Sequence, residues 1–190
     1  MEIIIDSTKI AVCHNKRTSR NKVFKDIATI GKSSMGWFFG FKLHLVCNDK
    51  GEVLNFCITP ANTDDRNADV ISKISKDLFG KLYGDKGYIS SNLFNLLFDN
   101  GLHLVTGIKK NMKNQLMPLY DKIMLRKRSV IETINDELKN ICQIEHSRHR
   151  STINFVINLF ASIGAYCFFD KKPAIKFERV VTDNQPLLFY

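Results

Sequence analysis

The stretch EIIIDSTKI, residues 2–10, decides how the rest of the chain is interpreted. Its apolar run Ile3-Ile4-Ile5 predicts a strand near residues 2–6 that is buried on both faces. Asp6 follows the run directly, and a carboxylate there is costly to bury without a partner. A divalent cation is the natural partner. The stretch therefore predicts a buried strand that delivers an acidic metal ligand.

A second acidic residue has a similar setting. Asp85 follows a short apolar strand in KLYGDKGYIS, residues 81–90. Gly87 lets the backbone turn just after it, which leaves the carboxylate at the end of the strand.

A third acidic residue, Glu132, lies in a segment of helical periodicity. Arg128, Glu132 and Lys139 are spaced by four and seven residues, so they share one face of a helix predicted near 129–145. The opposite, packing face is expected to carry Ile131, Ile134, Leu138 and Ile141. A carboxylate between two cations suits a phosphate beside a metal ion, but a solvated face held by i,i+4 ion pairs explains the same pattern.

The order of these three segments resembles the DDE transposases of bacterial insertion sequences, in the insertion-sequence-four-like superfamily. The run DST at residues 6–8 matches an aspartate that follows a hydrophobic strand and precedes small hydroxyl residues. The run DKGY at residues 85–88 matches the second motif. Arg128, Glu132 and Lys139 occupy the last three positions of a Y-x2-R-x3-E-x6-K signature.

The signature's tyrosine is replaced by Leu125 in this chain. Residues 39–66, FGFKLHLVCNDKGEVLNFCITPANTDDR, are similar to the family's second and third strands. The resemblance implies an α/β fold of the ribonuclease H-like class, with a mixed sheet of three antiparallel strands, then alternating helix and strand, and flanking helices. The predicted domain is 1–170, followed by a C-terminal tail, 171–190.

The resemblance also implies a chemistry. Asp6, Asp85 and Glu132 would be the catalytic residues and the ligands of two Mg²⁺ ions, with Mn²⁺ as a substitute. Two such ions stabilise the attacking and leaving oxygens of an in-line phosphoryl displacement. Attack by water nicks DNA, and attack by a 3′-hydroxyl joins strands. Arg128 and Lys139 would neutralise phosphate charge.

The charge of the chain favours a polyanionic partner, here double-stranded DNA. Its 28 lysines and arginines exceed its 19 aspartates and glutamates, which gives a net charge of +9 and a pI near 9.3. Part of the excess falls between residues 13 and 35, which is expected to be a loop. The candidate DNA contacts are Lys16, Arg17 and Arg20 in that loop, and Lys86 of the DKGY run. A mobile, solvated loop is an equally good interpretation.

The five cysteines are scattered and odd in number, which argues against a disulfide scaffold. One metal-like spacing exists, Cys142-x3-His146-x2-His149. Arg148 and Arg150 interleave with it, so the segment favours phosphate contact over zinc binding.

Periodicity and turn residues predict the remaining elements. Strands are expected near 37–47 and 52–59, joined by a hairpin turn at 48–51, and near 103–108. Helices are expected near 66–78, 90–99 and 152–169. The basic connection 111–127 either closes over DNA or is a simple surface loop. Asp64 and Asp65 are the alternative site carboxylates, and capping of helix 66–78 is their expected role.

The apolar run 153–169 is shorter than the roughly 20 residues that span a bilayer. A polar stripe of Asn154, Asn158 and Ser162 predicts an amphipathic helix that closes the fold, so no membrane partner is expected. No signal peptide pattern opens the sequence. A bacterial cytoplasmic location, on the nucleoid when DNA is bound, is therefore expected.

The expected function is that of a transposase catalytic domain, which cleaves and transfers DNA at insertion-sequence ends and targets. A homodimer in the DNA complex is compatible with it. Because Asp6 stands so near Met1, the chain is expected to lack the N-terminal end-binding region. The alternatives are an inactive DNA-binding remnant of a transposase and a ribonuclease H-like nuclease.

Overall fold

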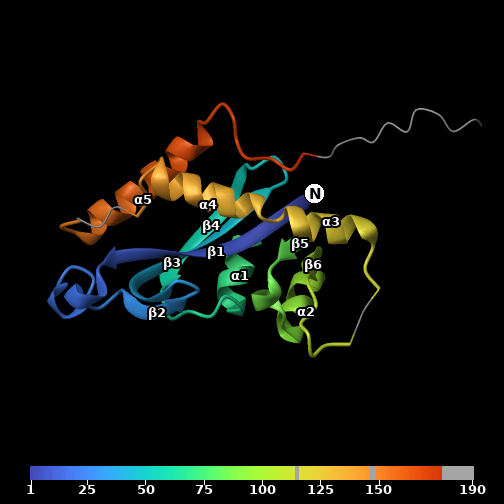
Figure 1. Ribbon diagram of the computed structural model, residues 1–190, viewed down its shortest axis with the longest axis horizontal. Coiled ribbons are helices and arrows are strands. Elements are labelled where there is room, and N and C mark those ends of the chain that lie inside the picture. The colour runs from blue at the N-terminus through green and yellow to red at the C-terminus, as the bar shows by residue number, and fades with distance from the viewer. Residues whose placement is uncertain (114–115, 146–148, 177–190) are drawn as a thin grey trace, which may run out of the picture.

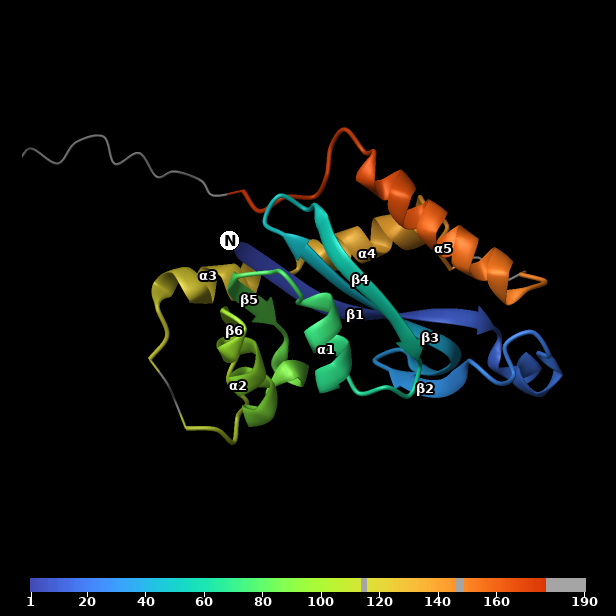
Figure 2. The ribbon, with the colours of Figure 1, turned by 180° about the vertical axis from the view of Figure 1, so that it is seen from behind.

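The structure, a computed structural model, describes residues 1–113, 116–145 and 149–176. A six-stranded mixed sheet lies between two layers of helices (Figure 1). One face carries α3 (Leu119–Lys127), α4 (Val130–Asn140) and α5 (Thr152–Cys167). The other face carries α1 (Ala68–Ile74) and α2 (Ser91–Asp99), which the reverse view shows below the strands, opposite α4 and α5 (Figure 2).

The sheet has the predicted ribonuclease H-like order. Strands β1 (Glu2–Cys13), β3 (Gly36–Asn48) and β4 (Val53–Pro60) are antiparallel neighbours, with β3 in the centre. Strands β5 (Gly80–Gly84) and β6 (Leu102–Thr106) follow on the other side of β1 and run parallel to it. The predicted turn at 48–51 joins β3 to β4, and Gly51 adopts the positive φ that this turn requires.

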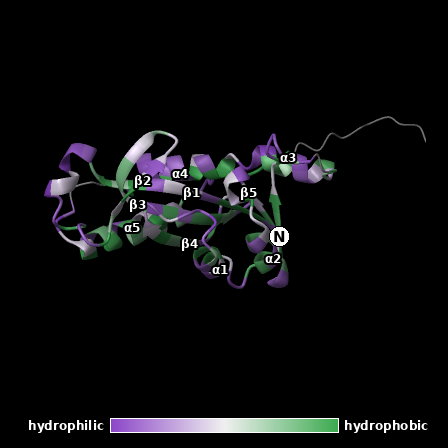
Figure 3. Ribbon diagram, turned by 90° about the horizontal axis from the view of Figure 1, so that it is seen from below, coloured by the Kyte–Doolittle hydropathy of each residue, from purple (hydrophilic) through white to green (hydrophobic). Residues whose placement is uncertain are grey.

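Strand β1 belongs to two cores at once. Ile3 and Ile5 pack with the residues of α1 and α2, whereas Ile4 and Ile10 pack with those of α4 and α5. Successive side chains of a strand point to opposite faces, so an unbroken isoleucine run suits a strand that is covered on both sides. Helices α2, α3 and α4 each carry both hydrophilic and hydrophobic residues, as this position requires (Figure 3).

The predicted end of this strand near residue 6 is wrong. β1 continues to Cys13 and pairs with β3 along its whole length, with Asp6 opposite Leu45. Asp6 therefore lies inside the strand. The apolar run ends at Ile5, but a strand needs backbone partners rather than apolar side chains, and β3 supplies them for the polar half of β1.

β1 and β5 pair only from Glu2 to Ile4, because β5 ends at Gly84. Beyond Ile4, the edge of β1 on that side has no neighbouring strand among the described residues. A notch results beside the carboxyl end of β5. Asp85, the first residue after β5, stands next to the open part of β1.

The predicted loop between residues 13 and 35 is partly ordered. It contains the 3-10 helix η1 (Asn15–Arg20) and a further strand, β2 (Thr29–Ser33), which pairs with the first residues of β3. β2 and β4 therefore follow one another along the same edge of β3. Gly31 allows this arrangement, since a Cβ there would meet the carbonyl oxygen of Ala61 at 2.2 Å.

Three helix boundaries also differ from the predictions. The connection 111–127 ends in α3, whose Met124 is buried against Tyr83 and Val105. Helix α4 ends at Asn140, and Ile141, expected in the core, is 63% exposed. Helix α1 is shorter than predicted. Its N-cap is Asn67, whose side chain accepts hydrogen bonds from two backbone N–H groups of the first turn.

Two of the three residues in the polar stripe of α5, Asn158 and Ser162, face the protein. The Ser162 hydroxyl donates to the Cys142 carbonyl oxygen at 2.8 Å, and Asn158 Nδ2 donates to the Gln143 carbonyl oxygen at 3.3 Å. Several apolar side chains of α5 are exposed instead, namely Ile153, Val156, Ile157 and Phe160. Among the described helices, none is long and apolar enough to cross a membrane.

The first six residues of the predicted tail pack on the domain without forming a helix or strand. The Ile175 N–H donates to the Asp49 carbonyl oxygen at 2.8 Å, and the Ile175 side chain packs against the core beside α4. Residues 177–190 lie outside the described residues. The domain boundary at residue 170 stays a prediction.

Helix α3 is fastened to the sheet by one buried carboxylate, Asp121. It accepts hydrogen bonds from Lys81 Nζ at 2.7 Å and from the Tyr83 hydroxyl at 2.9 Å. Burial raises the pKa of Asp121, but these two bonds outweigh burial and hold the pKa below its usual value. We expect Asp121→Asn to lower the free energy of unfolding by about 2 kcal/mol at pH 7 in urea denaturation.

The loss should depend on pH. A carboxyl whose pKa is lower in the folded than in the unfolded state stabilises the fold above its unfolded pKa, and the effect disappears as pH falls through the folded pKa. The difference between wild type and Asp121→Asn is therefore expected to shrink below about pH 4. Asp99→Asn, at an exposed position in α2, is the control and should change stability little at either pH.

Candidate active site

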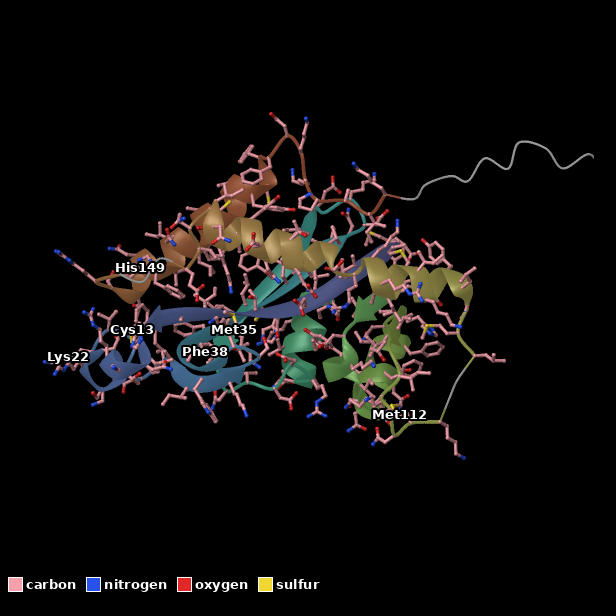
Figure 4. The ribbon with its side chains drawn as sticks, in the orientation of Figure 1. Cys13, Lys22, Met35, Phe38, Met112 and His149 are labelled. Carbon is pink, nitrogen blue, oxygen red and sulfur yellow. The ribbon has the colours of Figure 1, made fainter. Side chains whose placement is uncertain are left out.

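A hollow of about 510 Å³ lies along the open edge of β1, beside the end of β5. Three of the predicted site residues line it: Asp6, Asp85 and Lys139. Met35 and Phe38, from the β2–β3 hairpin, line it as well. Figure 4 places these two side chains nearer the middle of the molecule than Cys13, at the end of β1, and Lys22, beyond it.

Asp6 is the buried carboxylate of this site, with 22% of its side chain exposed. Burial raises the pKa of Asp6 to about 6, and the neighbouring charges of Asp85 and Glu132 add to the rise. The positive charge of Arg128 opposes it. Asn135, on α4, donates to Asp6 Oδ2 at 3.3 Å. The three predicted acidic residues therefore interact electrostatically, with Asp6 the most desolvated.

Arg128 links two of these carboxylates. It lies between α3 and α4, with Nη1 3.8 Å from Asp6 Oδ1 and Nη2 3.7 Å from Glu132 Oε1. Both contacts are longer than hydrogen bonds, and the buried Nη1 has no hydrogen-bond partner among the described residues. Glu132 lies in the first turn of α4 with 63% of its side chain exposed, outside the lining of the hollow.

Asp85 is held by the turn that follows β5. Its Oδ1 accepts a hydrogen bond from the Gly87 N–H at 2.7 Å and so caps the short 3-10 helix η2 (Lys86–Tyr88). A Cβ at position 87 would stand 2.8 Å from the same oxygen. The tyrosine of the DKGY run is buried below the hollow, packed on Gly84. The motif therefore fixes an exposed carboxylate over a buried aromatic ring.

Lys139, on α4, lines the hollow. Its Nζ lies 3.8 Å from Glu145 Oε2, and 20% of its side chain is exposed. Burial lowers the pKa of Lys139, while Glu145 and Asp6 act in the opposite direction. The Lys139 ammonium therefore lies near Asp6, and the charge of Asp6 offsets only part of its positive charge.

No three carboxylate, histidine or cysteine side chains within the described residues converge closely enough to hold a metal ion as they stand. Arg128 supplies the positive charge between Asp6 and Glu132 in this arrangement. The oxygen atoms of Asp6, Asp85 and Glu132 are nevertheless of the kind that Mg²⁺ and Mn²⁺ prefer.

The other predicted DNA contacts lie away from the hollow. Lys86 is exposed beside Gly107, and Lys16, Arg17 and Arg20 are exposed on η1 at the far end of β1. A strand rises roughly 3.3 Å per residue, so Cys13 is about 23 Å from Asp6. Arg150 is exposed just before α5, and Arg148 lies outside the described residues.

Sequence reasoning provided no indication that β3 contributes to the site through Lys42, and it offered Asp65 only as an alternative site carboxylate. Lys42 and Asp65 line the hollow, and Asp65 Oδ1 accepts hydrogen bonds from the Ser7 hydroxyl at 2.8 Å and from Lys42 Nζ at 3.1 Å. The expected cap role of Asp64 and Asp65 is therefore wrong, since Asn67 caps α1 and Asp64 bonds Arg66. Lys42 and His44 alternate with apolar residues within a buried strand, which is the signal that could have revealed this side of the site.

The sequence matches the family model of the transposase DDE domain over residues 2–152. The chain belongs to the transposase DDE domain family. The matched range contains Asp6, Asp85 and Glu132, and enzymes of this family depend on divalent metal ions. No curated protein matches the sequence of this DDE domain significantly.

The DDE domain also resembles solved structures. A piggyBac transposase in a synaptic complex with hairpin DNA superposes with a TM-score of 0.54 at 11% identity, over 87% of this chain and 46% of that chain. The catalytic core domain of BIV integrase gives a TM-score of 0.46 at 12% identity, over 87% and 82% of the two chains. The family match confirms the predicted class, a transposase DDE domain. The likeness to the piggyBac transposase is one of fold, and this chain spans less than half of the length of that chain.

The position of the Asp85 carboxylate is expected to depend on Gly87. Gly87→Ala places a methyl group against Asp85 Oδ1 and should push the carboxylate out of its capping position. We expect metal-dependent DNA nicking to fall by about tenfold to 100-fold, because small displacements of reacting groups are costly. The thermal melting temperature should change little, since Asp85 is exposed.

Gly164→Ala is the matched control, since a Cβ there meets no atom within 4 Å. It should leave nicking unchanged. Full activity of Gly87→Ala would show that the cap does not position Asp85 for the reaction.

Proposed function

We propose that this DDE domain cleaves DNA strands and transfers them in the transposition of a bacterial insertion sequence, with Asp6, Asp85 and Glu132 as its catalytic carboxylates. One observation carries the proposal. Asp6 lies inside β1 with only 22% of its side chain exposed, shares a hollow with Asp85, and is linked to Glu132 through Arg128. A buried carboxylate of raised pKa beside two others is an arrangement that costs stability and calls for a cationic ligand.

Two Mg²⁺ ions, or Mn²⁺ in their place, are the proposed cofactors. The donor set fits, because three carboxylates offer the oxygen ligands that these ions prefer. The buried Nη1 of Arg128, which has no hydrogen-bond partner among the described residues, suits a phosphate oxygen beside the ions. Asp6, Asp85 and Glu132 would hold the ions. The ions would supply Lewis acidity at the attacking and leaving oxygens of the phosphodiester.

The residues of the chain have separate parts in this reaction. Asp6 is held in a fixed position, because its strand is paired with β3. The other groups of the site are arranged around it. Arg128 can turn from the carboxylates to the phosphate, since its contacts to Asp6 and Glu132 are long. Lys139 is poised to offset the negative charge on the non-bridging oxygens in the transition state. A water molecule or a DNA 3′-hydroxyl is the nucleophile.

Double-stranded DNA is the proposed partner, at the ends of the element and at the target. Arg128 and Lys139 would contact the phosphates nearest the reaction. Five exposed residues, Lys16, Arg17, Arg20, Lys86 and Arg150, are proposed as peripheral phosphate contacts. Arg148, which lies outside the described residues, is proposed for the same role from its place in the sequence. A homodimer on DNA and a place on the bacterial nucleoid in the cytoplasm accord with this role.

Removal of one proposed ligand tests the function. The purified chain is expected to nick supercoiled plasmid in Mg²⁺ or Mn²⁺ and not in EDTA. Asp85→Asn should lower the nicking rate by at least about 100-fold, because it removes a charge at the site while leaving the volume unchanged. Circular dichroism and thermal melting should match the wild type, since Asp85 is exposed.

Asp99→Asn, which makes the same chemical change on α2, is the control and should nick normally. Undiminished nicking by Asp85→Asn would move the reaction away from the DKGY run. Folded protein that binds DNA and never nicks it would favour the inactive remnant instead.

A further inference from the structure

A second hollow, of about 470 Å³, adjoins the candidate active site and shares Lys32, Lys42 and Asp65 with it. Its charged lining residues are Lys32, Lys42, Arg66, Lys109, Asp64 and Asp65. Four positive charges thus face two negative ones. Asp64 is already engaged, because Arg66 donates to its Oδ1 and Oδ2 at 3.0 and 2.7 Å. The remaining lining is cationic around Lys42.

The second hollow opens on the other face of the sheet from Arg128. Asp6 contacts α4, whereas its neighbour Ser7 bonds Asp65, on the segment that leads into α1. Lys42 lies on the Ser7 face as well, because its side chain also bonds Asp65. The alternation of β1 and β3 therefore gives the site two walls, with the open edge of β1 between them.

Lys42 is built into this wall rather than free on the surface. Only 16% of its side chain is exposed, and its ammonium donates to the Thr63 carbonyl oxygen at 2.8 Å and to Asp65 Oδ1 at 3.1 Å. An ammonium has three donors, so a third hydrogen remains for a ligand in either hollow. Asp65 is fixed in turn by the Ser7 hydroxyl, one residue from Asp6.

We propose that the second hollow binds a phosphate of the DNA backbone, with Lys42 as the contact that it shares with the active site and Asp65 as the residue that positions Lys42. The proposal rests on the proposed function in one respect, that the ligand is DNA. Lysines at a concave surface recognise phosphates without reading bases. One duplex would then be held on both sides of the open edge of β1.

The exposed lysines of the hollow give the first test. Binding of a labelled duplex of random sequence is measured by fluorescence anisotropy in EDTA at several salt concentrations. For Lys32→Gln/Lys109→Gln, the slope of log affinity against log salt should become shallower by about 0.9, since each neutralised phosphate contributes about 0.9 and the hollow is proposed to neutralise one. Both side chains are exposed, so the variant should fold normally.

The matched control is Lys73→Gln/Lys76→Gln, which removes the same charge from exposed positions on and just after α1, outside the hollow. Its slope should equal that of the wild type. Equal changes in the two double variants would overturn the proposal, because the effect would then be one of net charge.

The sign of the effect of Asp65→Asn tests the role of Asp65. Removing a negative charge near DNA strengthens binding if charge alone matters. If Asp65 positions Lys42, the variant should bind the duplex several-fold more weakly, to the same extent as Lys42→Gln. Tighter binding would overturn the positioning role. Asp69→Asn, exposed in the first turn of α1, is the control and should not weaken binding.

Binding in EDTA and nicking in Mg²⁺ separate this inference from the proposed function. A changed salt slope in a protein that never nicks DNA would sink the proposed reaction and leave the second hollow as a phosphate site. Normal nicking with an unchanged salt slope would leave the proposed reaction standing and overturn the second hollow as a phosphate site.

Discussion

The partial burial of the Asp6 carboxylate is the constraint on which the surrounding structure depends. Asp6 loses much of its hydration because it lies inside a strand that is packed between two helical layers. Desolvation favours the neutral acid, as the pKa of about 6 indicates. Asn135 and Arg128 approach Asp6 from α4 and its N-terminal junction, but their contacts are long. The resting domain therefore offsets only part of the cost. Further positive charge near Asp6 would lower the remaining cost of burying its carboxylate.

The notch beside Asp6 exists because β5 is short. β5 has five residues, and it pairs with only three residues of β1. A longer β5 would cover Asp6 and turn the site into ordinary sheet. Because β5 stops at Gly84, one open space is bordered by Asp85 and by side chains from both faces of β1. Ligand sites of α/β sheets gather at the carboxyl ends of strands for the same reason.

Many of the strands and helices could be predicted from the sequence, because they carry apolar runs or helical periodicity. The ribonuclease H-like order of the sheet was expected from the family resemblance of the three acidic motifs. The parts that were missed depend on tertiary partners. β2 has only one fully buried residue, Gly31, and exists because β3 pairs with it. Asp65 stands beside a helix start, where its local sequence suggests a cap. Its actual partners, Ser7 and Lys42, are 58 and 23 residues away. Local patterns carry no information at such separations.

The open edge of β1 has a consequence for the behaviour of the protein in solution. A strand edge without a neighbour presents backbone N–H and C=O groups, which invite pairing with another molecule. The side chain of Glu145 covers one of these donors, the N–H of Ala11, at 2.8 Å. Lys9 places a charge beside the same edge, and like charges on two copies discourage edge-to-edge pairing. Lys9 and the contact of Glu145 thus oppose edge-to-edge pairing of two copies in solution, and neutralising Lys9 would favour aggregation through this edge.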